Sequence, residues 1–402
     1  MTFARCARSL ALLLAAFGTM GASLPPEPAS TALPPFVQAY EPTGVDERGL
    51  WMEADESERV LRDSALILRD DGLNRYVRSV LCQEVGEERC RGVRIYIVEV
   101  PQFNASMAPN GTMRVWTGLL LRVQNEAELA AVLGHEFAHF ELRHGLAGAQ
   151  KRRNAAGLVA WISVLGAGAS MVGGTTVGTS ALQLGVVGSY YQFNRAQEAQ
   201  ADLLSLKYTR NSPYPAIAAS NVWKRMMAES DARAIARGQT PGKEYKAGFF
   251  DTHPATPDRA AYLAAEAEKM GGGGDLRAQA YRDAIRPFLP RLLAAQVKSN
   301  DFGGSDYLLQ TMSGVEGWTG ELLFARGELY RQRAAPRDLA TAADLFRQAI
   351  DKGYSDPVVH RELGLSLLRN GDQAQGKSAL QQYLTLKPDA TDKGVISTLV
   401  AN

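Results

Sequence analysis

The residues best suited to do chemistry lie in the segment HEFAH, residues 135–139. Four residues are little more than one helical turn, so in a helix His135 and His139 share a face and can bind one metal ion. A hydrolytic zinc ion takes three protein ligands and keeps a position for water, so one more ligand is needed. The spacing permits a zinc-hydrolase site, and an ordinary amphipathic helix is the alternative.

The third ligand must come from another part of the chain. Glu198, in the helical segment EAQAD, is the strongest candidate, and Asp202 one turn further can accept a hydrogen bond from a zinc-bound imidazole. His144 follows His139 by five residues and is turned away from the face of His135. We expect His144 to lie against the C-terminal dipole of the helix and not to bind the metal.

Local patterns predict the elements around this motif. Residues 56–81 have apolar positions at helical spacing, with an Asp-Gly break at 71 and 72, which predicts two helices. The β-branched segment VRIYIVEV, residues 93–100, predicts a buried strand. In residues 104–120 the sequence Pro-Asn-Gly at 109–111 predicts a turn between two extended arms.

The helix that carries HEFAH has its own start and stop signals. Asn125 can cap the first amide groups, and Glu128 follows three residues later. Gly145 is the expected stop.

Composition and the N-terminal region indicate an exported, soluble chain. The 402 residues carry a formal net charge of +1, so no overall field favours nucleic acid or anionic lipid. Arg5 and Arg8 precede an apolar run at 10–17 and small residues, the pattern of a secretory signal over residues 1–23. Residues 24–45 form a proline-rich linker. In an oxidising compartment we favour a Cys82–Cys90 disulfide over two free buried thiols.

Residues 154–194 contain no charged side chain. We favour a flap or a partly buried helical segment over contact with a membrane. The reason is that the glycines of this segment weaken any helix that would have to span a bilayer. The run GGGG at 271–274 marks the expected domain boundary.

A repeat is visible in residues 275–402. LFARGELY (323–330) with ADLFRQAI (343–350), and HRELGLSL (360–367) with SALQQYLTLKP (378–388), place Gly327 and Gly364 at matching positions. This region resembles a tetratricopeptide array, and a generic helical bundle is the alternative. Stacked repeats form a concave surface that binds partners.

Together, HEFAHFELRH, EAQAD, DERGLW (46–51), NASMAPNGTMRVWTGLL (104–120) and HPATPDR (253–259) resemble the Glu-zincin peptidases of the CAAX-prenyl-protease and HtpX-like family. More narrowly, they are similar to the BepA-type branch with a tetratricopeptide tail. The resemblance implies a mainly α fold. In this fold an α+β catalytic domain with a small sheet would cover residues 46–268, and a helical tetratricopeptide-like domain would cover residues 275–402.

The resemblance also implies roles in a site with one Zn²⁺ per chain. His135, His139 and Glu198 would be the ligands, and Glu136 the base that takes a proton from the attacking water. The segment HPATPDR offers His253 and Arg259 to stabilise the oxyanion of the reaction. His253 could instead occupy the open metal position and keep the enzyme latent.

The arm Asn104, Ala105, Ser106 and Met107 matches the family's edge strand, which would bind substrate as an added strand. We therefore expect a periplasmic zinc endopeptidase that cleaves unfolded or mis-assembled polypeptides in outer-membrane protein quality control, with envelope assembly proteins bound through the tail. The alternative is a chaperone or scaffold with an idle or structural metal site. The sequence does not decide the natural substrate or the oligomeric state.

Overall fold

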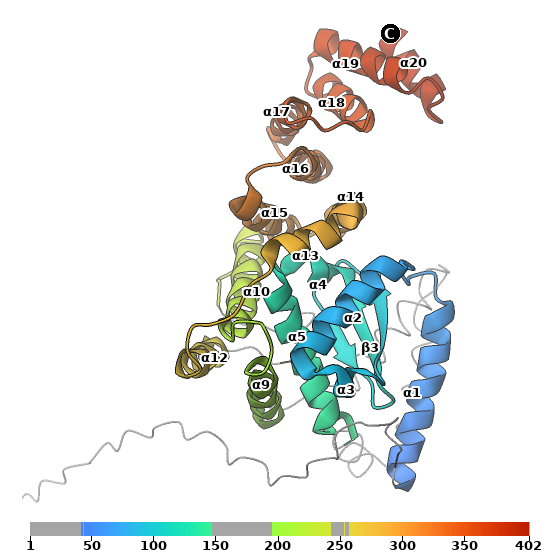
Figure 1. Ribbon diagram of the computed structural model, residues 1–402. Helices are drawn as coiled ribbons and strands as arrows, with labels where there is room; N and C mark the ends of the chain where they lie inside the picture. The colour runs from blue at the N-terminus through green and yellow to red at the C-terminus, as the bar shows by residue number, and fades with distance from the viewer. Residues whose placement is uncertain (1–41, 43, 147–194, 243–252, 254–256, 402) are drawn as a thin grey trace, which may run out of the picture. The chain divides into compact units, whose positions relative to one another are not determined.

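A computed structural model describes residues 42, 44–146, 195–242, 253 and 257–401 (Figure 1). Within them, helices surround one three-stranded sheet, and further helices follow towards the C-terminus. The prediction of a mainly α protein with a small sheet is confirmed. The predicted signal, most of the proline-rich linker and the charge-free segment lie outside the described residues.

The first two helices are α1 (Val45–Asp63) and α2 (Asp71–Val85). The break between them precedes the Asp-Gly pair, so the predicted break at 71 and 72 is wrong. The reason is local: the side chain of Asp70 accepts a hydrogen bond from the amide of Leu73 at 2.8 Å. This cap starts α2 early enough for Asp71 and Gly72 to form its first turn.

A short helix, α3 (Glu87–Cys90), returns beside α2. Cys82 and Cys90 are joined by a disulfide, as the sequence analysis favoured. The bond ties α3 to the last turn of α2.

The sheet contains β1 (Arg94–Val98), β2 (Ala105–Met107) and β3 (Thr112–Trp116) in the order β1-β3-β2. β3 pairs in parallel with β1 and antiparallel with β2, so the predicted buried strand and hairpin are confirmed. Gly111 has φ of 87°, which the tight turn requires and which glycine adopts without strain. Among the described strands, β2 lies at an edge of the sheet.

Helix α5 (Glu126–Glu141) follows α4 (Thr117–Arg122) and carries the HEFAH motif. The side chain of Asn125 accepts a hydrogen bond from the amide of Glu128 at 2.9 Å, which confirms the predicted cap. Gly145 does not end this helix. The helix ends four residues earlier, at Glu141, and Arg143 beyond it adopts a left-handed conformation with φ of 53°.

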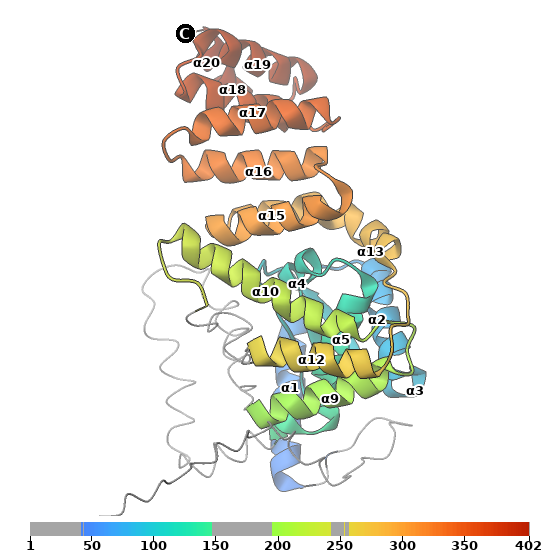
Figure 2. The same cartoon turned by 90° about the vertical axis from the view of Figure 1, so that its left-hand side faces the viewer.

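Helix α5 is enclosed by other helices and by the sheet. Every residue from Glu126 to His139 is buried, as expected for a helix enclosed on all sides. It packs on α2, β2, α9 (Arg195–Thr209) and α10 (Ile217–Ala236), and α10 in turn packs on α12 (Pro257–Lys269) (Figure 2). Of the described helices, none is both long and apolar enough to cross a membrane.

The remaining helices start with α13 (Ala278–Ile285), a 3₁₀ turn (Arg286–Phe288) and α14 (Leu289–Val297). They continue with α15 (Phe302–Glu316), α16 (Gly320–Arg333), α17 (Asp338–Asp351), α18 (Val358–Arg369), α19 (Gln373–Leu386) and α20 (Lys393–Ala401). From α16 on, each helix packs on the next. The apolar core around α5 includes Leu322, Ala325 and Leu329 of α16. A second cluster begins on the same helix with Leu323, and a third begins with Leu380.

Both glycines of the proposed repeat lie where two helices touch. A Cβ on Gly327 would be 2.6 Å from the ring of Phe346, and one on Gly364 would be 2.7 Å from the side chain of Leu380. In each hairpin a glycine of the first helix admits a bulky side chain of the second. This supports the tetratricopeptide interpretation, which stays a prediction.

Candidate metal centre

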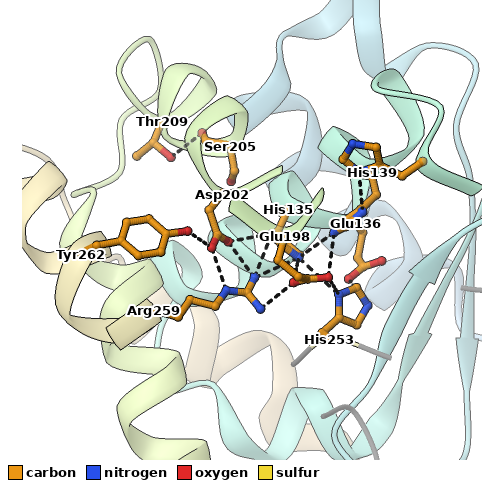
Figure 3. A network of polar contacts seen from close by, with 11 residues as sticks. His135, Glu136, His139, Glu198, Asp202, Ser205, Thr209, His253, Arg259 and Tyr262 are labelled. Atoms are coloured by element: carbon orange, nitrogen blue, oxygen red, sulfur yellow. Dashed lines mark hydrogen bonds and ion pairs between the residues drawn. The ribbon is translucent and has the colours of Figure 1, made fainter. Parts of the chain in front are cut away.

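Four potential ligands converge from three segments of the chain (Figure 3). His135 and His139 lie one turn apart on α5, Glu198 comes from the first turn of α9, and His253 lies shortly before α12. All four side chains are buried, and their ligand atoms lie within 4.8 Å of one another. The structure thus brings together the three residues that the sequence analysis expected as ligands, and adds His253 to them.

The distances between these atoms fit a tetrahedral zinc ion. With bonds of about 2.0–2.1 Å, tetrahedral ligand atoms lie about 3.3–3.4 Å apart. The Nε2 atoms of His135 and His139 are 3.1 Å apart, and Nε2 of His135 is 3.4 Å from Nδ1 of His253. Oxygen atoms of Glu198 lie 3.4 Å from Nε2 of His135, 3.4 Å from Nε2 of His139 and 3.0 Å from Nδ1 of His253. Three imidazoles and one carboxylate at these separations suit zinc.

Asp202 lies behind His135, where the sequence analysis placed it. Its Oδ1 is 3.0 Å from Nδ1 of His135, so the carboxylate can accept the Nδ1 proton and leave Nε2 free to bind a metal. Burial opposes protonation of His135, but the hydrogen bonds to Asp202 and Glu198 raise its pKa to about 9. Burial also opposes ionisation of Asp202, but the charges and hydrogen bonds of Arg259 and His135 together lower the pKa of that carboxyl.

Arg259 contacts two carboxylates and also lies beside the His135 ring, with its Nη2 3.2 Å from Nε2 of His135. Its Nε and Nη2 each donate to Asp202 at 2.7 Å, and its Nη1 forms an ion pair with Glu198 at 2.6 Å. The guanidinium also stacks over the ring of Trp223, 3.8 Å from the centroid. Tyr262 donates a further hydrogen bond to Asp202. This geometry indicates that Arg259 holds the two acidic side chains in position. It does not favour the predicted contact between Arg259 and an oxyanion.

Glu136 lies beside the cluster and is fully buried. Its Oε1 is 3.4 Å from Nε2 of His253. Burial raises the pKa of the Glu136 carboxyl above its usual value. A carboxylate of raised basicity next to a metal ligand is suited to accept a proton at near-neutral pH.

His144 contacts His139, so the prediction that it is turned away from the ligand face of α5 is wrong. Its Nδ1 is 3.0 Å from Nδ1 of His139, and its Nε2 is 3.1 Å from Oε1 of Gln200. The early end of α5 and the turn at Arg143 return the side chain to the site. It is not among the ligand atoms, as expected.

The sequence did not indicate Gln200, Trp223 and Tyr262 as residues of this site, because no local pattern distinguishes them.

The predicted substrate arm, residues 104–107, includes strand β2, which packs on α5. Phe103, the residue before the arm, lines the same cavity of about 20 Å³ as His135, Asp202 and Trp223. The arm therefore begins next to the metal centre.

Comparison with known proteins places this site in a family of peptidases. Residues 68–267 match peptidase family M48. This span includes His135, His139, Glu198 and His253. The chain carries a metallopeptidase domain that uses zinc, and the cluster of His135, His139, Glu198 and His253 could hold one metal ion.

Three relatives show the extent of the similarity. Metalloendopeptidase OMA1, mitochondrial, of Bos taurus is 30% identical over 183 residues, which covers 42% of this chain and 31% of that protein. The Beta-barrel assembly-enhancing protease of Yersinia pestis is 27% identical over 186 residues, covering 43% and 36%. Metalloprotease LoiP of Escherichia coli (strain K12) is 28% identical over 164 residues, covering 40% and 57%. Residues 68–267 thus form a domain of peptidase family M48, and the chain spans less than two thirds of the length of each of these relatives.

Proposed function

We propose that the protein is an exported zinc-dependent endopeptidase that cleaves unfolded or mis-assembled polypeptides. The observation that carries the proposal is the buried convergence of His135, His139 and Glu198 with Glu136 directly beside them. A site with a purely structural metal has no use for that additional carboxylate.

Each residue has a part in peptide hydrolysis. When bound, zinc polarises the scissile carbonyl and lowers the pKa of water. Glu136 takes the proton of the attacking water and delivers it to the leaving amine. Asp202 orients His135, and Arg259 holds Asp202 and Glu198 in position, which is the role we propose for it instead of oxyanion binding.

The position of β2 at an edge of the sheet, among the described strands, supports the binding of extended polypeptides. The amide of Trp116 donates to the carbonyl of Asn104, and the amide of Ala108 donates to the carbonyl of Thr112. In an antiparallel ladder alternate residues pair, so the backbone N–H and C=O groups of Ala105 and Met107 point away from β3, although both residues are buried. A substrate added there forms main-chain hydrogen bonds that depend little on side chains. Unfolded segments meet this requirement and folded proteins do not.

We further propose a periplasmic setting in envelope protein quality control, with assembly proteins bound by the helical tail. The similarity to the Beta-barrel assembly-enhancing protease and to LoiP supports this, as do the disulfide and the secretory pattern of residues 1–23. A scaffold with an idle metal site stays the alternative. The two differ in whether the bound metal supports catalysis.

The test compares wild type with Glu136→Gln on casein, after the zinc content of both has been measured. Gln keeps the shape of the side chain and cannot act as a base. We expect equal zinc and cleavage reduced by about 10²- to 10⁴-fold. Equal zinc with no cleavage by wild type would favour the scaffold.

A further inference from the structure

We propose that His144 and Gln200 form a relay behind His139 that selects the tautomer in which His139 can bind metal. His144 is then a positioning residue, since it acts through His139 and does not touch substrate. The inference rests on the proposed function, because it takes His139 as a zinc ligand.

The turn after α5 builds this contact. Arg143 is in the left-handed region, and the next residue, His144, is buried with its Nδ1 3.0 Å from Nδ1 of His139. The rings of His139 and His144 meet edge to face, with centroids 4.9 Å apart and an angle of 70° between their planes. Gln200, two residues after Glu198 on α9, closes the relay from the other side.

The direction of the relay follows from the acceptor at its end. Oε1 of Gln200 cannot donate, so Nε2 of His144 must carry the proton between them. In a neutral imidazole Nδ1 of His144 is then an acceptor, and it receives the Nδ1 proton of His139. This leaves Nε2 of His139 without a proton, and that is the atom in the ligand cluster. The reverse relay would direct an N–H at the metal position.

The two imidazoles of α5 therefore have different partners. His135 is held by the carboxylate of Asp202, whereas His139 is held by a neutral ring. The centre already contains the buried carboxyl groups of Glu136, Glu198 and Asp202. A neutral partner orients His139 without a further negative charge, which would have to be buried without a cation of its own.

The experiment measures zinc affinity of the full chain by competition with a chromogenic chelator. His144→Phe keeps a buried ring and removes both nitrogen atoms, and we expect zinc binding about 10- to 100-fold weaker. His144→Asn can present an amide oxygen near the place of Nδ1, and it should recover most of the affinity. His360→Phe, at a histidine in α18, is the matched control and should bind zinc as wild type does. Thermal unfolding of the metal-free proteins tests whether the substitutions affect folding.

The outcomes separate this inference from the proposed function. Weak binding by His144→Phe, recovery in His144→Asn and similar melting temperatures of the metal-free proteins support the relay. Equal affinity of His144→Phe and wild type would overturn it, and so would a His144→Asn protein as weak as His144→Phe. If wild type itself binds no zinc, the proposed function fails together with the relay.

Discussion

At the metal centre, the positive charge of one residue, Arg259, balances the negative charges of buried carboxylates. Glu198 and Asp202 are both buried, and the single guanidinium of Arg259 contacts both. Burial opposes ionisation of Glu198, but His253 and Arg259 hold the pKa of its carboxyl well below the usual range. Both acidic groups are therefore ionised at neutral pH, as a metal ligand and its supporting acceptor must be.

His253 lies where a fourth metal ligand would bind. This position favours the interpretation that His253 occupies the open metal position and keeps the enzyme latent, over the interpretation that it stabilises the transition state. We expect His253→Ala to cleave casein about 10- to 100-fold faster if the open form is populated at about 1–10% in wild type. Zinc content must be equal in the two proteins for the rates to be compared. A fall in the rate at equal zinc would instead assign His253 to the transition state.

Glu84 of α2 gives a pH dependence of stability. Burial raises its pKa to about 7, although Thr209 donates a hydrogen bond to it at 2.5 Å. Because the folded pKa lies above the ordinary value of 4.5, the fold favours the protonated form. Stability is then full below about pH 4.5 and is lost as pH rises through about 7.

Glu84→Gln resembles the protonated carboxyl and should remove this loss. We expect the variant to exceed wild type in free energy of unfolding above pH 7 by an amount on the order of 3 kcal/mol, with little difference near pH 5. Urea denaturation of the metal-free proteins at pH 5 and pH 8 measures both values. A difference that does not change with pH would contradict the assignment.

At the scale of elements, the site depends on how closely α5, α2 and α9 approach each other. Gly134, the residue before His135, lies at this contact. A Cβ there would be 3.0 Å from Cγ of Glu84 and 3.1 Å from Oγ of Ser205. The missing side chain lets α9 come close enough to bring Glu198 to the histidines of α5.

Gly134→Val should separate these helices and weaken zinc binding. Its two methyl groups have no space beside Glu84 and Ser205, so α9 must shift by a distance that the ligand geometry does not tolerate. We expect at least a tenfold loss of zinc affinity in the competition assay. Gly314→Val is the control and should bind zinc normally, because a Cβ at that helical glycine would have nothing within 4 Å.

On the scale of the whole molecule, the helices after the glycine run belong to the core of the peptidase part. Tyr281 donates a hydrogen bond to the carbonyl of Leu120. Arg122 of α4 donates to Glu229 of α10 at 2.7 Å, and also to Gln296 of α14. Gly274 packs against the backbone near Tyr214, where a Cβ would be 2.6 Å away. Of the glycine run, only Gly274 makes such a contact, and Gly271 to Gly273 have nothing within 4 Å of a Cβ. Helices α13 to α16 complete the core.

Truncation tests this dependence. A chain that ends after Arg333 keeps the core intact and should keep its zinc. A chain that ends after Met270 loses Tyr281, Leu292 and Leu293 from that core, which removes several buried side chains at about 1.5–3 kcal/mol each. We expect it to unfold at a much lower temperature and to lose zinc. Equal melting temperatures of the two truncated proteins would show that the peptidase part folds without α13 to α16.

The sequence by itself determined the features that depend on neighbouring residues. The pair His135 and His139 share a face because of helical periodicity, and Asn125 caps α5 because its side chain reaches an amide three residues away. The turn at Gly111 follows from the conformational freedom of glycine. Glu198 was the strongest candidate in the sequence for a third ligand, and the family resemblance added His253, but no local rule connects either residue to α5.

Only the tertiary structure decided which atoms meet. The orientations of the Arg259 and His144 side chains depend on carboxylate and imidazole groups that approach from other segments. The orientation of His144 also depends on the left-handed backbone conformation of Arg143. Sequence spacing alone turned His144 away, because it assumed a helix that continued to Gly145. The physical reason is that buried polar groups must find partners, and the partners available are set by how the helices pack.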